Sequence, residues 1–274
     1  MDCYQRKGLR FDVRDTGPAG GDAVVCLHGF PQDATSFDGV ARRLADQGLR
    51  VLAPDQRGYG PRARPTDVGA YALGELTGDV LALLDAAGLA GAHVVGHDWG
   101  GVVAWALAGR HPDRVRSLTV VSTPHPRALR AVMRTSSQGL RSAYMAFFSL
   151  PVLPEAVLGA AGGTPLRRWL TATGLPAERA DHYVRRVREP GALTAALAWY
   201  RAVGRSRGQG GGRVSVPTRY LWGTRDPFFS RAAADLTPSH VTGPCAVRYL
   251  DGAGHWLPET HPDEVAAEVL AGLR

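Results

Sequence analysis

An aspartate between two glycines is the first feature of this chain that suggests chemistry. Asp98 is the centre of the string Gly96-His97-Asp98-Trp99-Gly100, where an apolar run ends and a helical pattern begins. A strand that turns into a helix through this G-x-nucleophile-x-G pattern lifts the central side chain above the end of a sheet. Because an ordinary aspartate has a pKa of about 3.9, it is charged at neutral pH and can attack carbon without a base. The string therefore predicts a carboxylate nucleophile and a covalent ester intermediate.

Two later residues fit the remaining places of a catalytic triad. When the nucleophile stands on such a turn, an acid and then a histidine follow along the chain, each on a loop after a strand. Asp226 and His255 each follow an apolar, strand-like run, in that order. His255 is the expected general base for the water that hydrolyses the ester, and Asp226 is expected to hold its tautomer and balance its charge. A serine nucleophile would need the same pair for its first step, so the aspartate excludes ordinary esterase chemistry.

Backbone N–H groups near the nucleophile are the expected donors of an oxyanion hole. The tetrahedral intermediate of ester hydrolysis would form on the carboxyl carbon of Asp98, and its negative oxygen needs hydrogen bonds. The N–H of Trp99, directly after the nucleophile, and that of Phe30, in a loop after an earlier strand, have suitable places in the sequence. Loss of such a donor typically costs about 3 kcal/mol of transition-state stabilisation.

The triad alone does not separate epoxides from alkyl halides as substrates. A ring oxygen that leaves must be protonated or strongly hydrogen-bonded, which requires neutral O–H donors such as tyrosine, with an ordinary pKa of about 10. A departing halide requires N–H donors, such as indole or amide groups. The choice between these two reactions therefore depends on residues outside the triad.

Strand-like and helix-like segments alternate along most of the chain and would place the triad at one edge of a sheet. Short apolar runs predict strands at 9–14, 23–27, 50–53, 92–96, 117–122, 218–222 and 246–250. Helical patterns are present at 37–47, 76–89, 101–109 and 262–273. Strands that are apolar on both faces and alternate with helices are typical of the α/β class, with a mostly parallel sheet flanked by helices.

The alternation stops between residues 125 and 213. This segment is helix-like, with proline and glycine interruptions, and it ends in the glycine-rich string 208–212, which has the composition of a flexible hinge. A helical insertion between two strands of a parallel sheet would form a cap above the strand ends, where α/β folds bind ligands. We therefore expect a core domain of residues 1–124 and 214–274 and a helical cap (lid) domain of residues 125–213.

Five short strings, in order along the chain, resemble the epoxide hydrolase branch of the α/β-hydrolase fold. They are His-Gly-Phe-Pro at 28–31, Asp-Gln-Arg-Gly-Tyr-Gly at 55–60, Gly-His-Asp-Trp-Gly-Gly at 96–101, Trp-Gly-Thr-Arg-Asp at 222–226 and Gly-His-Trp at 254–256. The resemblance runs from about residue 23 to the end of the chain and includes the place of the cap insertion. It implies an α/β-hydrolase fold, the Asp98 nucleophile, no cofactor, and an epoxide and water as reactants.

Two tyrosines of the predicted cap bear on the identity of the leaving group. Tyr144 and Tyr200 resemble the two cap tyrosines of epoxide hydrolases in local sequence and in their places near the start and end of the cap. The resemblance implies that they donate to the epoxide oxygen as it leaves, and Tyr183 is a weaker substitute for either role. The pair favours epoxide opening.

Two other functions stay open. Haloalkane dehalogenases also have a tryptophan after the nucleophile, as Trp99 is here, but Phe30 stands where many of them place an asparagine that holds the halide. Fluoroacetate-type dehalogenases have an arginine where this chain has Trp99. The third hypothesis is a ligand-binding protein that keeps the fold without turnover, because a fold does not dictate a function. The complete triad speaks against it.

Apolar residues in the motif loops or beside the two tyrosines are predicted to line a substrate pocket between cap and sheet. These residues are Pro31, Phe147, Phe148, Trp199, Phe228 and Trp256. Such a lining suits a small hydrophobic epoxide, for instance an aryl or alkyl oxirane.

The composition is that of a globular protein and argues against several classes of partner. The chain has 274 residues, 45% of them hydrophobic, and it lacks an apolar run of the roughly 20 residues that span a bilayer. We therefore expect a cytoplasmic monomer or homodimer with no membrane partner. The net charge is +7, and residues 125–213 hold fourteen arginines against four acids, yet no basic run is interleaved with aromatics as in nucleic-acid sites. Cysteines and histidines without ligand-like spacing predict no metal site.

Overall fold

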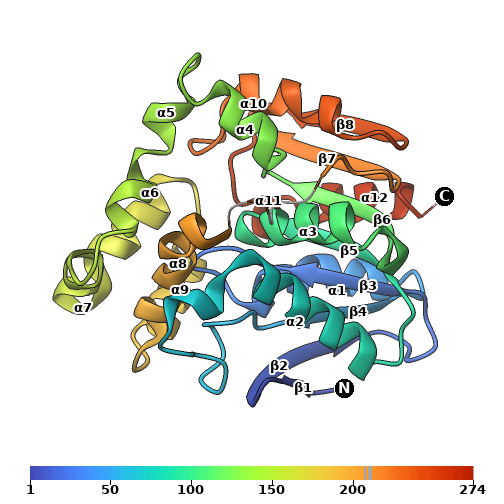
Figure 1. The fold of residues 1–274 in the computed structure, drawn as a ribbon, viewed down its shortest axis with the longest axis horizontal. Helices are drawn as coiled ribbons and strands as arrows, with labels where there is room; N and C mark the ends of the chain where they lie inside the picture. Colours follow the sequence, from blue (N-terminus) through green and yellow to red (C-terminus); the bar gives the residue numbers. More distant parts are fainter. Residues whose placement is uncertain (207, 209–211, 274) are drawn as a thin grey trace.

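Eight strands form one sheet, and helices cover both of its faces (Figure 1). The computed structural model describes residues 1–206, 208 and 212–273. The strand order is β1-β2-β4-β3-β5-β6-β7-β8, in which the pairs β1–β2 and β2–β4 are antiparallel and all other neighbours are parallel. The strands are β1 (Cys3–Arg6), β2 (Leu9–Thr16), β3 (Ala23–Leu27), β4 (Arg50–Pro54), β5 (Ala92–His97), β6 (Val115–Val121), β7 (Thr218–Gly223) and β8 (Cys245–Leu250).

The helices fall into two groups according to their place in the chain. Those outside the β6–β7 connection are α1 (Asp38–Ala45), α2 (Leu73–Ala86), α3 (Trp99–Arg110), α10 (Arg231–Leu236), α11 (Leu257–Thr260) and α12 (Pro262–Ala271). Those inside it are α4 (Pro126–Val132), α5 (Gln138–Arg141), α6 (Ala143–Phe148), α7 (Leu153–Ala172), α8 (Ala177–Val187) and α9 (Ala192–Arg201). Short 3₁₀ helices are η1 (Ala34–Phe37), η2 (Val68–Tyr71), η3 (Pro112–Arg114), η4 (Val203–Ser206) and η5 (Thr237–His240).

Strand β3 shows why the sheet is covered on both faces. All five of its residues are buried, and their side chains alternate between two hydrophobic clusters. Val24 and Cys26 pack in the cluster that contains α1 and α12, whereas Val25 and Leu27 pack with α2 and α3. Successive side chains of a strand point to opposite faces, so a strand that is apolar at every position needs a helix layer on each side. The predicted α/β class with a mostly parallel sheet is confirmed.

Strand β1 and helix α3 are among the elements that differ from the sequence prediction. Strand β1 was not predicted, and only Tyr4 of its four residues is buried, so its sequence carries almost no apolar periodicity. Helix α3 begins at Trp99, two residues before its predicted start at residue 101. The reason is local: Asp98 has a φ of 50°, and helical conformation begins at the next residue.

The connection between β6 and β7 contains helices and no strand among its described residues, as the sequence pattern predicts. Helices α6 to α9 lie together on the left of Figure 1, to one side of the sheet. Of the predicted hinge at 208–212, residues 209–211 lie outside the described part of the chain. The division into a core of residues 1–124 and 214–274 and a cap of residues 125–213 stays a prediction, and we use "insertion" below for residues 125–213.

Within the described ranges, no single helix has both the length and the apolar content needed to cross a membrane. The segments Gln138–Phe148 and Leu153–Ala172 meet those criteria only as a pair, and they are bent by 86° relative to each other.

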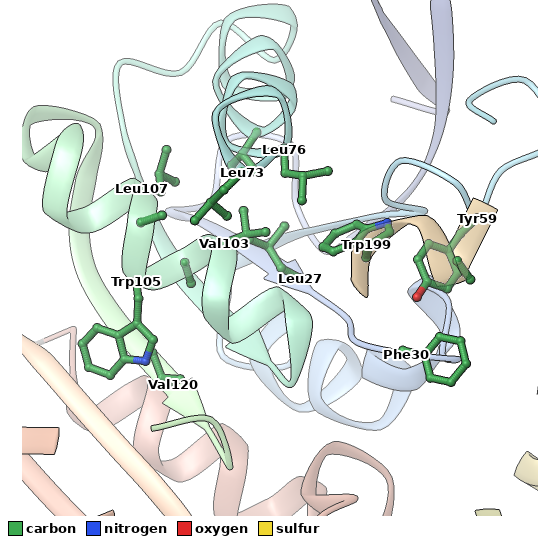
Figure 2. Packing of buried hydrophobic residues seen from close by; sticks show 14 of the residues in the cluster. Leu27, Phe30, Tyr59, Leu73, Leu76, Val103, Trp105, Leu107, Val120 and Trp199 are labelled. Carbon is green, nitrogen blue, oxygen red and sulfur yellow. The ribbon is translucent and has the colours of Figure 1, made fainter. Parts of the chain in front are cut away.

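Helix α3 is held against the sheet by an apolar layer that continues toward the insertion. Figure 2 shows Val103 of α3 close to Leu27 of β3, with Leu73 and Leu76 of α2 next to them in the same cluster. The same cluster includes Trp199 of α9, so the helix that follows Asp98 and a helix of the insertion share one hydrophobic core. This packing places the insertion directly beside the start of α3.

Candidate active site

Asp98 stands on a sharp turn between β5 and α3. Its φ of 50° and ψ of −121° are unusual for a residue with a side chain, and conformations of this kind cost of order 1–3 kcal/mol. The Thr123 hydroxyl donates to the Asp98 carbonyl oxygen over 2.8 Å and supports this backbone conformation. Gly100 allows close packing of the turn, because a Cβ at that position would lie 2.0 Å from the Leu27 carbonyl oxygen. The turn therefore has the form that the G-x-nucleophile-x-G string predicts.

The structure brings Asp98, Asp226 and His255 together from loops that follow three parallel strands, β5, β7 and β8. His255 Nδ1 lies 2.8 Å from Asp226 Oδ2, and His255 Nε2 lies 3.7 Å from Asp98 Oδ2. Asp226 is itself oriented by the N–H groups of Phe228 (2.7 Å) and Phe229 (3.0 Å), which both donate to its Oδ1. The histidine is thus held between two carboxylates, with its Nε2 directed to the nucleophile.

One of the two predicted oxyanion donors is hydrogen-bonded to Asp98, the predicted nucleophile. The Phe30 N–H donates to Asp98 Oδ1 over 2.8 Å. Gly29 makes room for this contact, because a Cβ there would lie 2.3 Å from the same carboxylate oxygen. The described hydrogen bonds include none from the Trp99 N–H to this carboxylate, so Trp99 as a second donor stays a prediction.

The mutual interaction of Asp98 and His255 shifts their pKa values in opposite directions. Burial alone would raise the pKa of Asp98, but the nearby positive charge of His255, whose Nε2 lies 3.7 Å from Oδ2, outweighs it and holds that pKa below its usual value. Burial alone would lower the pKa of His255, but Asp226 and Asp98 together raise it to about 9. The free protein therefore carries an ionised Asp98 and a protonated His255 at neutral pH.

Two histidines of the motif loops, His28 and His97, make hydrogen bonds around the turn. His28 Nε2 accepts from the Gln56 N–H over 3.1 Å. The two ring nitrogens of His97 lie 2.9 Å from Gln32 Oε1 and 2.9 Å from the His255 carbonyl oxygen. Burial and the neighbouring His255 lower the pKa of His97 to about 3. Among the described residues, no group of three or more His, Cys, Asp or Glu could hold a metal ion.

A cavity of about 320 Å³ opens above the nucleophile. Asp98, Trp99, Tyr144 and Tyr200 all line it, so the predicted nucleophile and both predicted tyrosines share one space. The other lining residues are mostly apolar. They are Tyr71, Leu73, Leu76, Val102, Thr123, Pro124, Pro126, Leu129, Arg130, Met133, Ser142, Met145, Trp199, Val203, Ser206, Gly208 and Phe229.

Tyr144 and Tyr200 come from α6 and α9 and meet over the cavity with ring centroids 6.3 Å apart. Burial raises the pKa of Tyr144 well above its usual value, and the nearby charge of Asp98 raises it further. Burial also raises the pKa of Tyr200, with smaller contributions from Tyr144 and Asp98. Both hydroxyl groups are therefore neutral donors throughout the physiological range of pH.

The predicted pocket residues divide into one that lines the cavity and five that do not. Trp199 lines it. Phe148 packs behind the two tyrosines, with ring centroids 5.3 Å from Tyr144 and 5.1 Å from Tyr200. Phe147 packs edgewise on Phe148 at 5.9 Å, and Pro31 lines a separate small pocket.

Phe228 and Trp256 pack against His255, the predicted base, instead of lining the cavity. Their ring centroids lie 4.8 Å and 5.0 Å from that of His255. Trp256 Nε1 also donates to the Thr173 carbonyl oxygen over 3.2 Å, which joins the His255 loop to the insertion. These two residues restrict the motion of the histidine ring, and direct contact with substrate stays a prediction for all five residues.

Several lining residues were not predicted from the sequence. Thr123 and Pro124 could have been found, because they follow directly after a predicted strand, and strand ends of a parallel sheet border the ligand site. Leu129 and Met133 of the α4 region have no comparable signal, because apolar residues at helical spacing are as common in a core as in a pocket.

Comparison with known proteins identifies the family of this chain. The family model described as "alpha/beta hydrolase fold" matches residues 22–262. The chain is 35% identical to AB hydrolase superfamily protein YfhM of Bacillus subtilis, covering 97% of this chain and 95% of that protein. It is 34% identical to Epoxide hydrolase A of Mycobacterium tuberculosis, covering 97% and 94%. The crystal structure of Epoxide Hydrolase A from Mycobacterium thermoresistibile superposes with a TM-score of 0.84 at 28% identity, covering 99% and 97%. The chain therefore belongs to the epoxide hydrolase family of the α/β-hydrolase fold.

Proposed function

We propose that this protein is an epoxide hydrolase, which adds water to an apolar epoxide and releases a vicinal diol through an ester on Asp98. The observation that carries the proposal is that an ionised carboxylate and two neutral tyrosine hydroxyls line the same mostly apolar cavity. The names of the relatives and of the similar structures support the same activity. An epoxide needs both groups at once, one to attack carbon and one to protonate the ring oxygen.

In the first step an oxygen of Asp98 attacks a ring carbon, and the bond from that carbon to the ring oxygen breaks. Oδ1 is held by the Phe30 N–H, so Oδ2 is the oxygen that attacks. The electron pair of the broken bond goes to the ring oxygen, which takes a proton from Tyr144 or Tyr200. The raised pKa of that tyrosine makes its anion a strong base. The anion therefore takes up the proton of His255, which reaches it through solvent, and the neutral tyrosine is formed again.

Ester formation removes the charge of Asp98, and this lowers the pKa of His255. The carboxylate of Asp98 is one of the groups that raise the pKa of His255 to about 9. Once that carboxylate is an ester, the pKa of His255 falls, so its Nε2 can take a proton from water. The hydroxide attacks the carboxyl carbon, and the Phe30 N–H stabilises the negative charge on Oδ1. Release of the diol returns Asp98 to a carboxylate and leaves His255 protonated.

Single turnover in water enriched in ¹⁸O tests the covalent route. With protein in excess over epoxide, the label should enter the side chain of Asp98, and the first diol should carry ordinary oxygen. Peptide mass spectrometry locates the label in the protein, and mass analysis of the diol gives its isotope content. Direct attack of water on the epoxide would put the label in the first diol and leave the protein unlabelled, which would overturn the proposal.

Removing either tyrosine hydroxyl should slow ester formation more than ester hydrolysis. We expect Tyr144→Phe and Tyr200→Phe each to lower the rate of ester formation about 10²-fold, because general acid catalysis contributes about 10²- to 10⁴-fold. Rapid-quench measurement of the two steps checks this result. Tyr71→Phe is the matched control, because Tyr71 lines the same cavity but donates its hydroxyl to the Pro65 carbonyl oxygen. Equal loss in all three variants would contradict the assignment.

The two chemical steps should respond differently to pH. Between about pH 6 and 9 ester formation should change little, because the pKa of Asp98 is lowered and the pKa values of Tyr144 and Tyr200 are raised well above 10. Ester hydrolysis should accelerate as pH rises, because it needs neutral His255, and its midpoint should lie below 9 once the Asp98 charge is gone. Stopped-flow tryptophan fluorescence can follow both steps, since Trp99 and Trp199 line the cavity. A hydrolysis rate that falls with rising pH would exclude His255 as the base.

Dehalogenation is the second candidate, because Trp99 lines the cavity beside the nucleophile. A halide site needs free N–H donors that face the leaving group. The other cavity indole, Trp199, already donates its Nε1–H to the Arg57 carbonyl oxygen over 2.8 Å. The cavity therefore offers tyrosine hydroxyls more readily than indole N–H groups, which favours epoxides. Halide release from chloro- and bromoalkanes, measured beside diol formation, distinguishes the two reactions.

A further inference from the structure

Glu259 is a buried acid that takes no direct part in the proposed reaction. It lies on α11, four residues after His255, and does not line the cavity. Its side chain is only 3% exposed, and both carboxylate oxygens accept hydrogen bonds. Oε1 accepts from Arg179 Nε over 2.9 Å and from the Tyr183 hydroxyl over 2.6 Å, and Oε2 accepts from Gln32 Nε2 over 2.9 Å. A buried carboxylate with three donors is costly to assemble, so its partners suggest what it does.

Glu259 determines which way the amide of Gln32 points. The Nε2 group of Gln32 faces the carboxylate, so its Oε1 faces the active site, where it accepts from the Gly29 N–H over 3.2 Å. The reverse orientation would place the amide oxygen against a carboxylate oxygen and the amide N–H₂ against the Gly29 N–H. The orientation of the Gln32 amide is therefore set by Glu259, a residue that does not line the cavity.

Gln32 contacts both loops on which the proposed chemistry depends. Gly29 precedes Phe30, whose N–H donates to Asp98 Oδ1. Gln32 Oε1 also lies 2.9 Å from His97 Nδ1, and His97 Nε2 lies 2.9 Å from the carbonyl oxygen of His255. The oxyanion donor and the catalytic histidine are thus both connected to Glu259 through one amide group.

The remaining donors to Glu259 come from the insertion. Arg179 and Tyr183 are one turn apart on α8, and their side chains point to the same acid. The same face of α8 carries Arg186, which pairs with Asp55 of the core over 2.9 Å and with Asp33 over 3.3 Å. His182 Nε2 of α8 also lies 2.8 Å from Asp33 Oδ2, so α8 contacts the core at several points, and the point formed by Arg179 and Tyr183 is the one that leads to Glu259.

We propose that Glu259 is a positioning residue, which couples the docking of α8 to the placement of His255 and of the Phe30 N–H through Gln32 and His97. This inference rests on the proposed function, because its effect is expressed in the two steps of that reaction. When the insertion is docked, Arg179 and Tyr183 hold Glu259, Glu259 holds Gln32, and Gln32 holds the two loops in the geometry that ester hydrolysis requires.

The variant Glu259→Gln tests the coupling, because the new amide must place an N–H₂ against one of the three donors. We expect ester hydrolysis to slow about 10- to 100-fold while ester formation changes less than about threefold, since a shift of about 1 Å in a catalytic group can cost 10²-fold. The ester should then accumulate during turnover, which lowers kcat and KM together. Tyr183→Phe removes only one donor and should give a smaller effect in the same direction.

Two further variants separate positioning from general stability. Arg186→Met removes the ion pairs of α8 with Asp55 and Asp33, which do not include Glu259, and should lower Tm without slowing ester hydrolysis. The double variant Gln32→Glu with Glu259→Gln exchanges acid and amide across one hydrogen bond and leaves acceptors for Arg179, Tyr183, Gly29 and His97, so it should recover most of the hydrolysis rate. The inference is overturned if Glu259→Gln hydrolyses the ester at the normal rate, if Arg186→Met slows hydrolysis equally, or if the exchange restores nothing. A native protein that forms neither ester nor diol would instead overturn the proposed function.

Discussion

Replacing His255 with glutamine should leave a protein that reacts once with an epoxide and then stops. The attack by Asp98 needs no base, because its pKa lies below the usual value for an aspartate. Hydrolysis of the ester needs a base at the position of His255 Nε2, 3.7 Å from Asp98 Oδ2. We expect the hydrolysis rate to fall about 10²- to 10⁴-fold, which is the usual contribution of a general base. The ester should accumulate to one per protein molecule.

Intact-protein mass spectrometry after addition of an epoxide measures this result. The mass should increase by that of one epoxide, and peptide mapping should locate the addition at Asp98. The double variant Asp98→Asn with His255→Gln should show no increase, and His261→Gln, which changes a histidine outside the cavity, should turn over normally. Diol formation by His255→Gln at the native rate, with no adduct, would show that His255 is not the base.

Replacing Gly29 with alanine should abolish most of the activity although position 29 carries no catalytic side chain. A Cβ there would lie 2.3 Å from both the Cβ and Oδ1 of Asp98, so the nucleophile must move. Movement of Oδ1 breaks its hydrogen bond with the Phe30 N–H, and loss of one oxyanion donor lowers kcat by about 10²- to 10³-fold. We expect a loss of at least about 10³-fold, because attack and hydrolysis both depend on this carboxylate.

Gly20→Ala is the matched control, since a Cβ at that position meets no atom within 4 Å. Steady-state diol formation and the thermal unfolding midpoint should be measured for both variants. The expected pattern is a large loss of kcat in Gly29→Ala with a folded protein, and unchanged kinetics in Gly20→Ala. Activity within a few-fold of the native value in Gly29→Ala would mean that Asp98 tolerates displacement, and the oxyanion assignment would fail.

The raised pKa of His255 helps to ensure that the two steps of the proposed reaction occur in sequence. In the free protein two carboxylates hold the ring in its protonated form, which cannot act as a base. Alkylation of Asp98 removes one of the two charges, so the base becomes available only when there is an ester to hydrolyse. In the proposed reaction the same carboxylate would therefore act as nucleophile and, through its charge, control the protonation of His255.

The sequence alone was sufficient for the fold class, and it predicted which groups the structure brings together around Asp98. The turn at Asp98 is specified locally, because neighbouring glycines permit close packing where the fully buried strand β5 ends. Asp226 and His255 could be predicted to lie near Asp98 because each follows a strand, and the carboxyl ends of parallel strands meet at one edge of a sheet. Phe30 could be predicted there for the same reason, and its N–H donates to Asp98 Oδ1.

Only the tertiary structure decided which side chains line the cavity and which stand behind it. Phe228 and Trp256 have the sequence context of pocket residues, yet they pack on His255, while Leu129 and Met133 line the cavity without a comparable sequence signal. The connection from Glu259 through Gln32 joins residues 227 positions apart, and no local pattern indicates it. Such contacts depend on how helices of the insertion pack against the core, which is a property of three-dimensional side-chain packing and not of local periodicity.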